Sequence, residues 1–296
     1  MIFRKMMVLH VVLVAVFVHV AVAQAEDVKI VPTAVTDQIY MLVGSGGNTG
    51  LFIGDDGSFL IDDQFGPLTE KIVQAVTSIG GEQPKFLFNT HYHGDHTGGN
   101  ENLGKGGTLI FSHDNVRERL QTGYFIGEFN MKQEGLGSVG LPVVTFSNEM
   151  SFHLNGDTVR AIHIPHSHTD GDSIIHFSSA NVVHAWDVFF NGFYPFIDVS
   201  HGGSLKGMIQ GVREILLLSD ENTKIIPGHG PLGNRAELQN YLQMLETAYG
   251  RLRKLKAEGK SVQEAMEAQP LKDLDETWGD GLFTSDKWIE IIYSGV

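Results

Sequence analysis

The chain has 296 residues, a formal net charge of −14 and no cysteine. The acidic balance disfavours nucleic acid as a partner, because binding to phosphates requires many Lys and Arg side chains. Without cysteine the chain has neither disulfides nor thiolate ligands. Its stability therefore depends on packing and on any metal site that other side chains can build.

The N-terminal segment has the layout of a secretory signal peptide over residues 1–25. Arg4 and Lys5 precede an uncharged apolar stretch at residues 6–23, and Ala23-Gln24-Ala25 offers a small-residue cleavage site. We predict cleavage after Ala25, which leaves one domain over residues 26–296 in a periplasmic or secreted protein without stable membrane association. A retained anchor is the alternative, since the apolar stretch is almost long enough to span a bilayer.

The rest of the chain predicts two successive rounds of strands and helices. In the first round, strands are expected at residues 38–43, 49–53, 58–61, 85–89 and 108–111, and helices at 69–79 and 114–120. In the second round, strands are expected on both sides of Asn155-Gly156-Asp157 and at residues 182–186 and 223–226. Ser204 and Asn234 are expected to cap helices at residues 204–218 and 234–256. This order predicts two sheet-plus-helix halves in one domain.

The most informative motif follows the strand expected at residues 85–89. It contains His91, His93, Asp95 and His96 within six residues. Neutral imidazoles and ionised carboxylates are the usual protein ligands of zinc and similar divalent ions. A His-rich surface turn is the simpler alternative.

Further candidate ligands follow later apolar runs, where strands give way to loops. His168 lies in the loop 165–172, Asp187 ends the run 182–186, and His229 follows the strand expected at 223–226. Loops held by a rigid scaffold are where catalytic groups concentrate. His166 is an alternative to His168, but the following Thr-Asp-Gly-Asp favours His168.

These motifs, in this order, resemble the metallo-β-lactamase superfamily over about residues 28–258. The HxHxDH motif of that family matches residues 91–96, its third histidine matches His168, its bridging aspartate matches Asp187, and its late PGHG histidine matches His229. The resemblance implies an α/β fold, a four-layer αββα sandwich of the metallo-β-lactamase type, with two metal ions at one edge.

The resemblance also implies how the ligands are shared between the ions. The first ion would be held by His91, His93 and His168, the second by Asp95, His96 and His229, and Asp187 would bridge them. The family usually has glycine just before the bridging aspartate, whereas this chain has Trp186. Trp186 could tilt Asp187 or narrow the pocket. With no cysteine, the second site resembles those of glyoxalase II-type hydrolases and histidine-rich β-lactamases.

The expected function is an exported hydrolase of a small-molecule substrate with two Zn²⁺ ions, although iron or manganese would also suit these ligands. A hydroxide bridging the ions would attack a carbonyl, with Asp95 as the catalytic side chain that orients it. We expect β-lactamase-type hydrolysis of a cyclic amide. A lactone, thioester or phosphodiester hydrolase is the alternative, as is a periplasmic metal-binding protein without turnover. The sequence does not predict an oligomeric state.

The substrate contacts are less directly indicated. Residues 121–141 are rich in glycine and contain Tyr124 and Phe125, so they could form an apolar wall or lid over the metals. Trp186 and Tyr194 could add to this wall, and ordinary loop packing is the alternative. Phe190 stands where cysteine-containing β-lactamases have a lysine that binds the substrate carboxylate.

Overall fold

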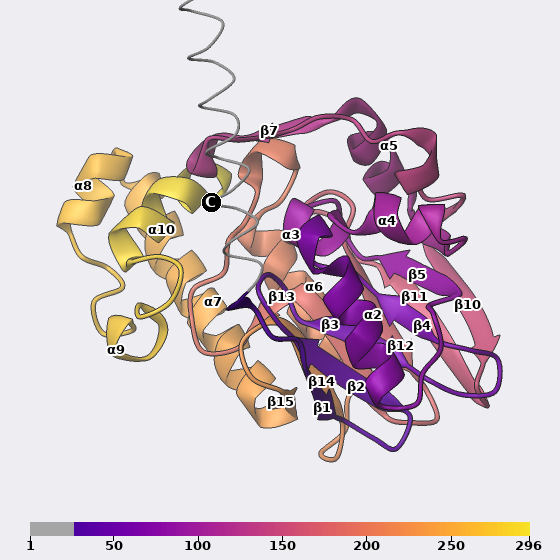
Figure 1. Cartoon of the computed structure of the whole chain (residues 1–296). Helices are drawn as coiled ribbons and strands as arrows, with labels where there is room; N and C mark the ends of the chain where they lie inside the picture. Colours follow the sequence, from indigo (N-terminus) through magenta and orange to yellow (C-terminus); the bar gives the residue numbers. More distant parts are fainter. Residues whose placement is uncertain (1–26) are drawn as a thin grey trace, which may run out of the picture.

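The computed structural model describes residues 27–296, so the predicted signal peptide and its cleavage site lie outside the described residues. Within 27–296, no helix has both the length and the hydropathy needed to cross a membrane. Figure 1 shows the strands arranged as two sheets, with helices around them.

The first sheet has seven strands in the order β1-β2-β3-β4-β5-β6-β9. Its strands are β1 (Val31–Ala34), β2 (Ile39–Val43), β3 (Thr49–Phe52), β4 (Phe59–Ile61), β5 (Phe86–Asn89), β6 (Leu109–His113) and β9 (Val144–Phe146). Neighbouring strands are antiparallel from β1 to β4 and parallel from β4 to β9. The helices of this half are α2 (Thr69–Ser78), α3 (Gly94–Thr97), α4 (Asn100–Lys105) and α5 (Asp114–Thr122).

The second sheet has six strands in the order β10-β11-β12-β13-β14-β15. Its strands are β10 (Glu149–Leu154), β11 (Asp157–His163), β12 (Ser173–Phe177), β13 (Val182–Phe190), β14 (Lys224–His229) and β15 (Gly233–Asn234). β13 and β14 are parallel and the other neighbours antiparallel. The helices α6 (Leu205–Leu217) and α7 (Arg235–Ala257) belong to this half. Short 3-10 helices lie at Gly66–Leu68, Gly127–Phe129, Ser138–Gly140, Val199–His201 and Tyr293–Gly295.

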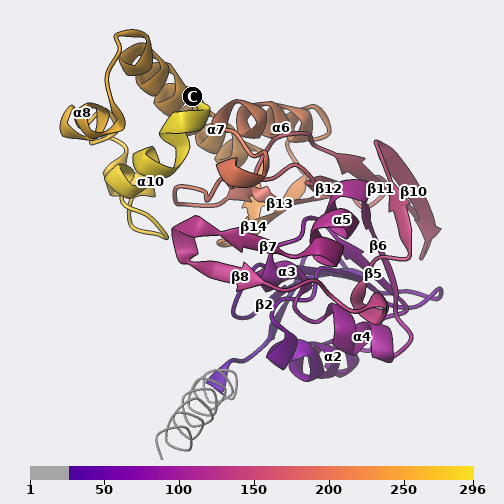
Figure 2. The same cartoon turned by 90° about the horizontal axis from the view of Figure 1, so that it is seen from above.

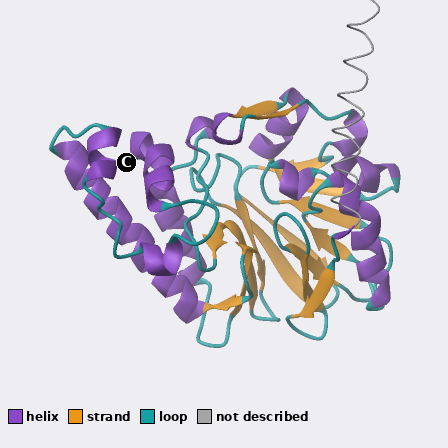
Figure 3. Ribbon diagram, turned by 60° about the vertical axis from the view of Figure 1, so that its left-hand side comes forward, coloured by secondary structure: helices purple, strands orange, loops and turns teal. Residues whose placement is uncertain are grey.

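Three apolar layers hold these elements together. Between the sheets, side chains of both interlock, and the ring of Phe52 lies 5.3 Å from that of Phe177. On the outer face of the first sheet, α2 and α4 bury Ile72, Val76 and Leu103. On the outer face of the second sheet, α6 and α7 pack on β13. Helices therefore lie on both sides of the paired sheets (Figure 3), and the predicted α/β four-layer αββα sandwich is confirmed.

Local sequence signals placed most of these elements correctly. Ser204 accepts a hydrogen bond from the backbone N–H of Gly207 and begins α6. Asn234 and Glu237 form the capping box that begins α7. Asp55-Asp56-Gly57, a typical hairpin turn sequence, lies between the antiparallel strands β3 and β4.

Among the elements that the sequence did not predict, two regions lie near the candidate ligands. Residues 121–141, for which an apolar wall or lid was expected with ordinary loop packing as the alternative, contain a two-stranded hairpin, β7 (Tyr124–Ile126) and β8 (Met131–Gln133). The C-terminal residues form the short helices α8 (Val262–Glu267), α9 (Asp275–Trp278) and α10 (Ser285–Ile292). Figure 2 shows the tip of the hairpin directed toward these C-terminal helices. Both regions border the site described next.

Candidate metal centre

The seven predicted ligands come from five segments that end at one edge of the sandwich. His91 and His93 follow β5, whereas Asp95 and His96 lie on the single turn of α3. His168 lies in the loop between β11 and β12, and His229 is the last residue of β14. Asp187 does not end its strand as expected: β13 continues to Phe190, and its pairing with β14 shifts register around Trp186. This irregularity lets one strand carry Asp187 into the site while staying in the sheet.

The first group of ligand atoms belongs to His91, His93, His168 and Asp187, all within 4.8 Å of one another. His168 Nε2 lies 2.9 Å from His93 Nδ1. Asp187 Oδ2 lies 3.3 Å from His168 Nε2 and 3.8 Å from His91 Nε2. All four side chains are buried.

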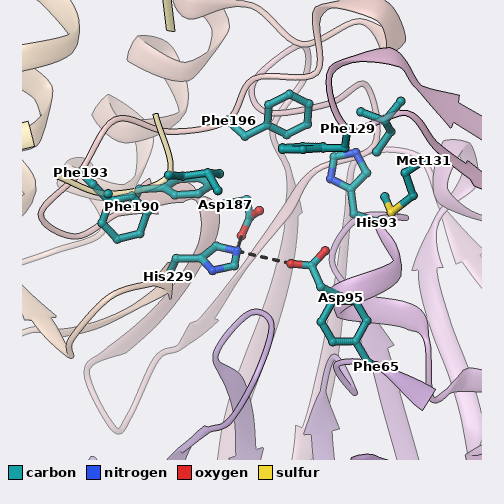
Figure 4. A pocket seen from close by; sticks show the side chains of 13 residues that line it. Phe65, His93, Asp95, Phe129, Met131, Asp187, Phe190, Phe193, Phe196 and His229 are labelled. Carbon is teal, nitrogen blue, oxygen red and sulfur yellow. Dashed lines mark ion pairs between the residues drawn. The ribbon is translucent and has the colours of Figure 1, made fainter. Parts of the chain in front are cut away.

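The second group belongs to Asp95, His96 and His229, also within 4.8 Å of one another. Asp95 Oδ2 lies 3.4 Å from His96 Nε2 and 3.6 Å from His229 Nε2. The other oxygen of Asp187, Oδ1, lies 3.4 Å from His96 Nε2 and 3.6 Å from His229 Nε2. Asp187 therefore presents one oxygen to each group; Figure 4 shows it with His229 and Asp95 at the base of a pocket.

Three buried ligand atoms have no hydrogen-bond partner among the described residues. They are His91 Nε2, His96 Nε2 and Asp187 Oδ1. Burying a polar atom without a partner is costly unless a ligand satisfies it. Burial lowers the pKa of His91 well below its usual range and that of His168 to about 4, so both rings are neutral near pH 7 and have a free lone pair. These properties suit a divalent cation.

Two buried aspartates that the sequence analysis did not identify contact the ring nitrogens of His93 and His96 that face away from the ligand groups. Asp62 accepts hydrogen bonds from Thr90 and lies 2.7 Å from His96 Nδ1. Asp198 accepts from the hydroxyl of Tyr92 at 2.7 Å and lies 3.1 Å from His93 Nε2. Such contacts set which ring nitrogen faces the site. Asp62 could have been found, since it directly follows a predicted strand, but nothing in the sequence marks Asp198.

Two glycines allow the backbone to approach the ligands closely. A Cβ atom on Gly228 would lie 2.0 Å from Asp187 Oδ1, and one on Gly47 would lie 2.1 Å from the ring of His96. Any larger residue at either position would displace the ligand, because a non-bonded carbon cannot come so near.

Trp186 does not turn Asp187 away from either group, although its backbone has φ 51, in the left-handed region. That conformation favours glycine, the residue that the family pattern has at this position. The Trp186 ring stacks on His184 at 4.0 Å and lies 5.0 Å from the ring of His96. It packs in the core between the sheets, beneath the site.

The four aromatic side chains expected to face the substrate do not line the pocket. Trp186 and Tyr194 are buried, and Tyr194 stacks on Trp288. Tyr124 is buried, and its hydroxyl donates to the carbonyl of Tyr92. Phe125 is 50% exposed on the outer side of the hairpin. The expectation is corrected: alternation along β7 directs Phe125 away from the site, and the other three rings are used in packing.

The pocket is nevertheless apolar, with a volume of about 430 Å³. Its base is formed by His93, Asp95, Asp187 and His229. Its walls are formed by Phe65, Ile126, Phe129, Met131, Phe190, Phe193, Phe196, Gly281 and Leu282. The walls thus come from the hairpin, from the segment at and after the end of β13, from the loop between α9 and α10, and from Phe65 after β4. Figure 4 shows the labelled aromatic side chains around the base.

Four further histidines of the described part of the chain have contacts outside the two ligand groups. His166 is exposed and lies 3.1 Å from the carbonyl of Gly202, so the choice of His168 as the inward-facing residue holds. His201 lies 2.8 Å from Asp198. His113 and His163 stack at 3.7 Å away from the ligand groups.

The stacked pair predicts a pH effect on stability. Burial and the adjacent His113 lower the pKa of His163 to about 4 from a usual 6.5, so the folded state resists its protonation. Its contribution to stability is present above the unfolded-state pKa and is lost as the pH falls toward the folded-state value. When the pH falls from about 7 to about 5, the free energy of unfolding should therefore decrease by about 1–2 kcal/mol less in His163→Gln than in the native chain. Urea unfolding of both proteins with chelator measures this, and equal losses would contradict it.

The comparisons with known proteins agree with this geometry. A family model described as the metallo-beta-lactamase superfamily matches residues 42–229. The chain therefore belongs to the metallo-β-lactamase superfamily. No curated protein matches it.

Solved structures show the same fold. A metallo-beta-lactamase from Pontibacter korlensis matches with a TM-score of 0.58 and 16% identity, covering 74% of this chain and 99% of that one. The metallo-beta-lactamase FIM-1 from Pseudomonas aeruginosa, in its mono-zinc form, matches with a TM-score of 0.59 and 18% identity, covering 75% and 97%. DIM-1 metallo-beta-lactamase matches with a TM-score of 0.60 and 18% identity, covering 75% and 100%.

Proposed function

We propose that this chain is a metal-dependent hydrolase that binds two divalent ions and cleaves a small carbonyl compound with water. One observation carries the proposal: the two oxygens of Asp187 face two separate groups of ligand atoms. A carboxylate placed in this way suits a pair of ions better than a single one.

The residues present fit such ions. His91, His93 and His168 would hold the first ion, and Asp95, His96 and His229 the second, with Asp187 shared between them. The unpartnered ring nitrogens of His91 and His96 would then acquire partners. Imidazole and carboxylate ligands without thiolate favour zinc, and iron or manganese are the alternatives that metal analysis would distinguish.

When bound, such ions lower the pKa of water and polarise a carbonyl oxygen, which supplies a nucleophile at neutral pH. Asp95 and the apolar side chains of the pocket would supply the other requirements of the reaction. Burial would raise the pKa of Asp95, but His96 and His229 lower it below its usual range, so Asp95 is ionised. It faces the pocket and can accept a hydrogen bond from water, orient it and take its proton. The apolar walls exclude other water from the reacting carbonyl.

Two substrate classes follow from different observations. The structural neighbours are described as metallo-β-lactamases, which favours a cyclic amide in an exported, periplasmic setting. The pocket favours a neutral lactone or ester, because no lysine or arginine lines it within residues 27–296. β-Lactam antibiotics carry a carboxylate that such a group would pair with. A panel of nitrocefin, lactone, ester, thioester and bis-phosphodiester substrates distinguishes these classes.

Removal of metal tests the function itself. Chelator treatment should abolish hydrolysis of every substrate in the panel that the protein cleaves, and added Zn²⁺ should restore it. His168→Ala should lose metal and activity, whereas His166→Ala, two residues away and outside the ligand groups, should keep both. Full activity in a protein shown to be metal-free would refute the proposal.

Asp198 is expected to position the first ion through His93. Asp198→Asn keeps the shape but replaces one acceptor oxygen by an amide N–H₂ that opposes the ring N–H. Loss of such a partner weakens metal binding by about ten- to a hundredfold. Zinc affinity measured against a chromophoric chelator tests this. Tyr92→Phe is the matched control, since it removes one donor to Asp198 and leaves the Asp198–His93 contact; equal affinities of D198N and the native chain would contradict the role.

A further inference from the structure

The pocket divides into a polar base and apolar walls. Its charged and titratable lining residues are His93, Asp95, Asp187 and His229, and all four are candidate ligands. Above them the walls consist of aromatic and aliphatic side chains together with Gly281. A substrate whose carbonyl reaches the base therefore has the rest of its structure among apolar side chains.

Within residues 27–296, the walls of the pocket carry no positively charged side chain that could pair with a negative group of a substrate. Among the described residues, neither lysine nor arginine lines the pocket, and the chain as a whole has a net charge of −14. Moving an ionised carboxylate from water into apolar surroundings costs much free energy when no partner is present. Away from the base, the pocket thus disfavours an anionic substrate.

The walls are joined by contacts between distant segments. Phe129, at the tip of the β7–β8 hairpin, lies 4.9 Å from the ring of Phe196 and 6.0 Å from that of Phe283. Leu282, the neighbour of Phe283, lines the pocket and lies beyond residues 42–229 that match the family model. The hairpin and the C-terminal segment therefore both contribute to the walls of the pocket and contact each other. Phe129 is placed to decide what fits there.

We propose that the pocket accepts an uncharged acyl compound, an ester or lactone whose apolar acyl chain lies against Phe129, Phe193 and Leu282. This inference rests on the proposed hydrolytic function. In the reaction, the oxygen of water bonds to the acyl carbon and the acyl–oxygen bond breaks. The alcohol leaves with one proton of the water, and the acid releases the other to solvent.

Hydrolysis by the metal-loaded protein tests the inference with para-nitrophenyl esters of acetate, butyrate, hexanoate and octanoate. We expect kcat/KM to rise about fourfold for each added methylene until the pocket is filled. The mono-ester of suberic acid has the length of the octanoyl ester but a carboxylate at its far end, and should react at least about a hundredfold more slowly. Equal rates across the series, or no penalty for the carboxylate, would overturn the inference.

Two phenylalanine variants test whether Phe129 causes the dependence of kcat/KM on acyl-chain length. Phe129→Ala should lower the ratio of octanoyl to acetyl kcat/KM by about tenfold. Phe125→Ala is the matched control, because Phe125 lies on the same hairpin, is 50% exposed and does not line the pocket. An unchanged ratio in F129A, or an equal decrease in F125A, would contradict the assignment.

Binding separates this inference from the proposed function. Calorimetry with the purified protein should show that octanamide binds and that suberamic acid, its analogue with a terminal carboxylate, does not. If octanamide binds but no ester, lactone, thioester, nitrocefin or phosphodiester of the panel is cleaved in a metal-dependent manner, the proposed function fails and the pocket assignment stands. If the acetyl ester is cleaved but neither rate nor binding depends on chain length and charge, the pocket assignment fails alone.

Discussion

Asp187→Asn should reduce kcat/KM by at least about a hundredfold and remove at least one metal ion per chain. Loss of a residue that only orients a metal ligand already lowers metal affinity or activity by about ten- to a hundredfold. Asp187 is itself a candidate ligand and lies within 3.3–3.8 Å of ligand nitrogens in both groups. Asparagine has nearly the same shape, but its amide nitrogen cannot serve as a metal ligand. Metal content measured by plasma spectroscopy, together with the rate on the best substrate, tests this.

Asp170→Asn is the matched control for that experiment. Asp170 lies in the same loop as His168 and forms an ion pair with Arg119 at 2.6 Å, but it belongs to neither group of ligand atoms. D170N should keep its metal and its rate. If D187N kept both as well, the shared carboxylate, and with it the pair of ions, would be the wrong interpretation.

Replacing Trp186 should produce the largest change in stability. Trp186→Ala removes a buried ring that packs between the sheets and stacks on His184 at 4.0 Å, and such truncations cost about 3–5 kcal/mol. Trp186→Gly should cost about 1 kcal/mol less than the alanine variant, because glycine adopts the left-handed backbone at residue 186 without strain. Urea unfolding of the three proteins gives both differences.

The critical outcome is which of the two variants, Trp186→Ala or Trp186→Gly, is the more stable. The Ala and Gly variants lack the same ring, so their difference reports the backbone alone. Trp186→Phe, which keeps an aromatic ring at the same φ, should lie between the native chain and both variants. If the alanine variant proved as stable as the glycine variant or more stable, the left-handed conformation at Trp186 would be refuted.

The sequence by itself identified the candidate ligands and most of the scaffold. The strands and helices were predictable where periodicity and capping are local properties, as at Ser204 and Asn234. The seven candidate ligands were identified because imidazoles and carboxylates stand at or after the ends of the expected apolar strands, although β13 continues beyond Asp187. Their assignment as metal ligands remains a prediction, to be tested by the variants described above.

Only the tertiary structure decided how the site is supported and what surrounds it. Asp198 reaches His93 from more than a hundred residues away, and Phe129 of the hairpin contacts Phe283 of the C-terminal segment. Neither contact leaves a local pattern, because it depends on the docking of separate segments. The sequence drew attention to the aromatic Trp186, Tyr194, Tyr124 and Phe125, yet an aromatic side chain packs equally well into a core or around a ligand. Which of the two it does depends on the direction of the backbone, as the left-handed turn at Trp186 shows.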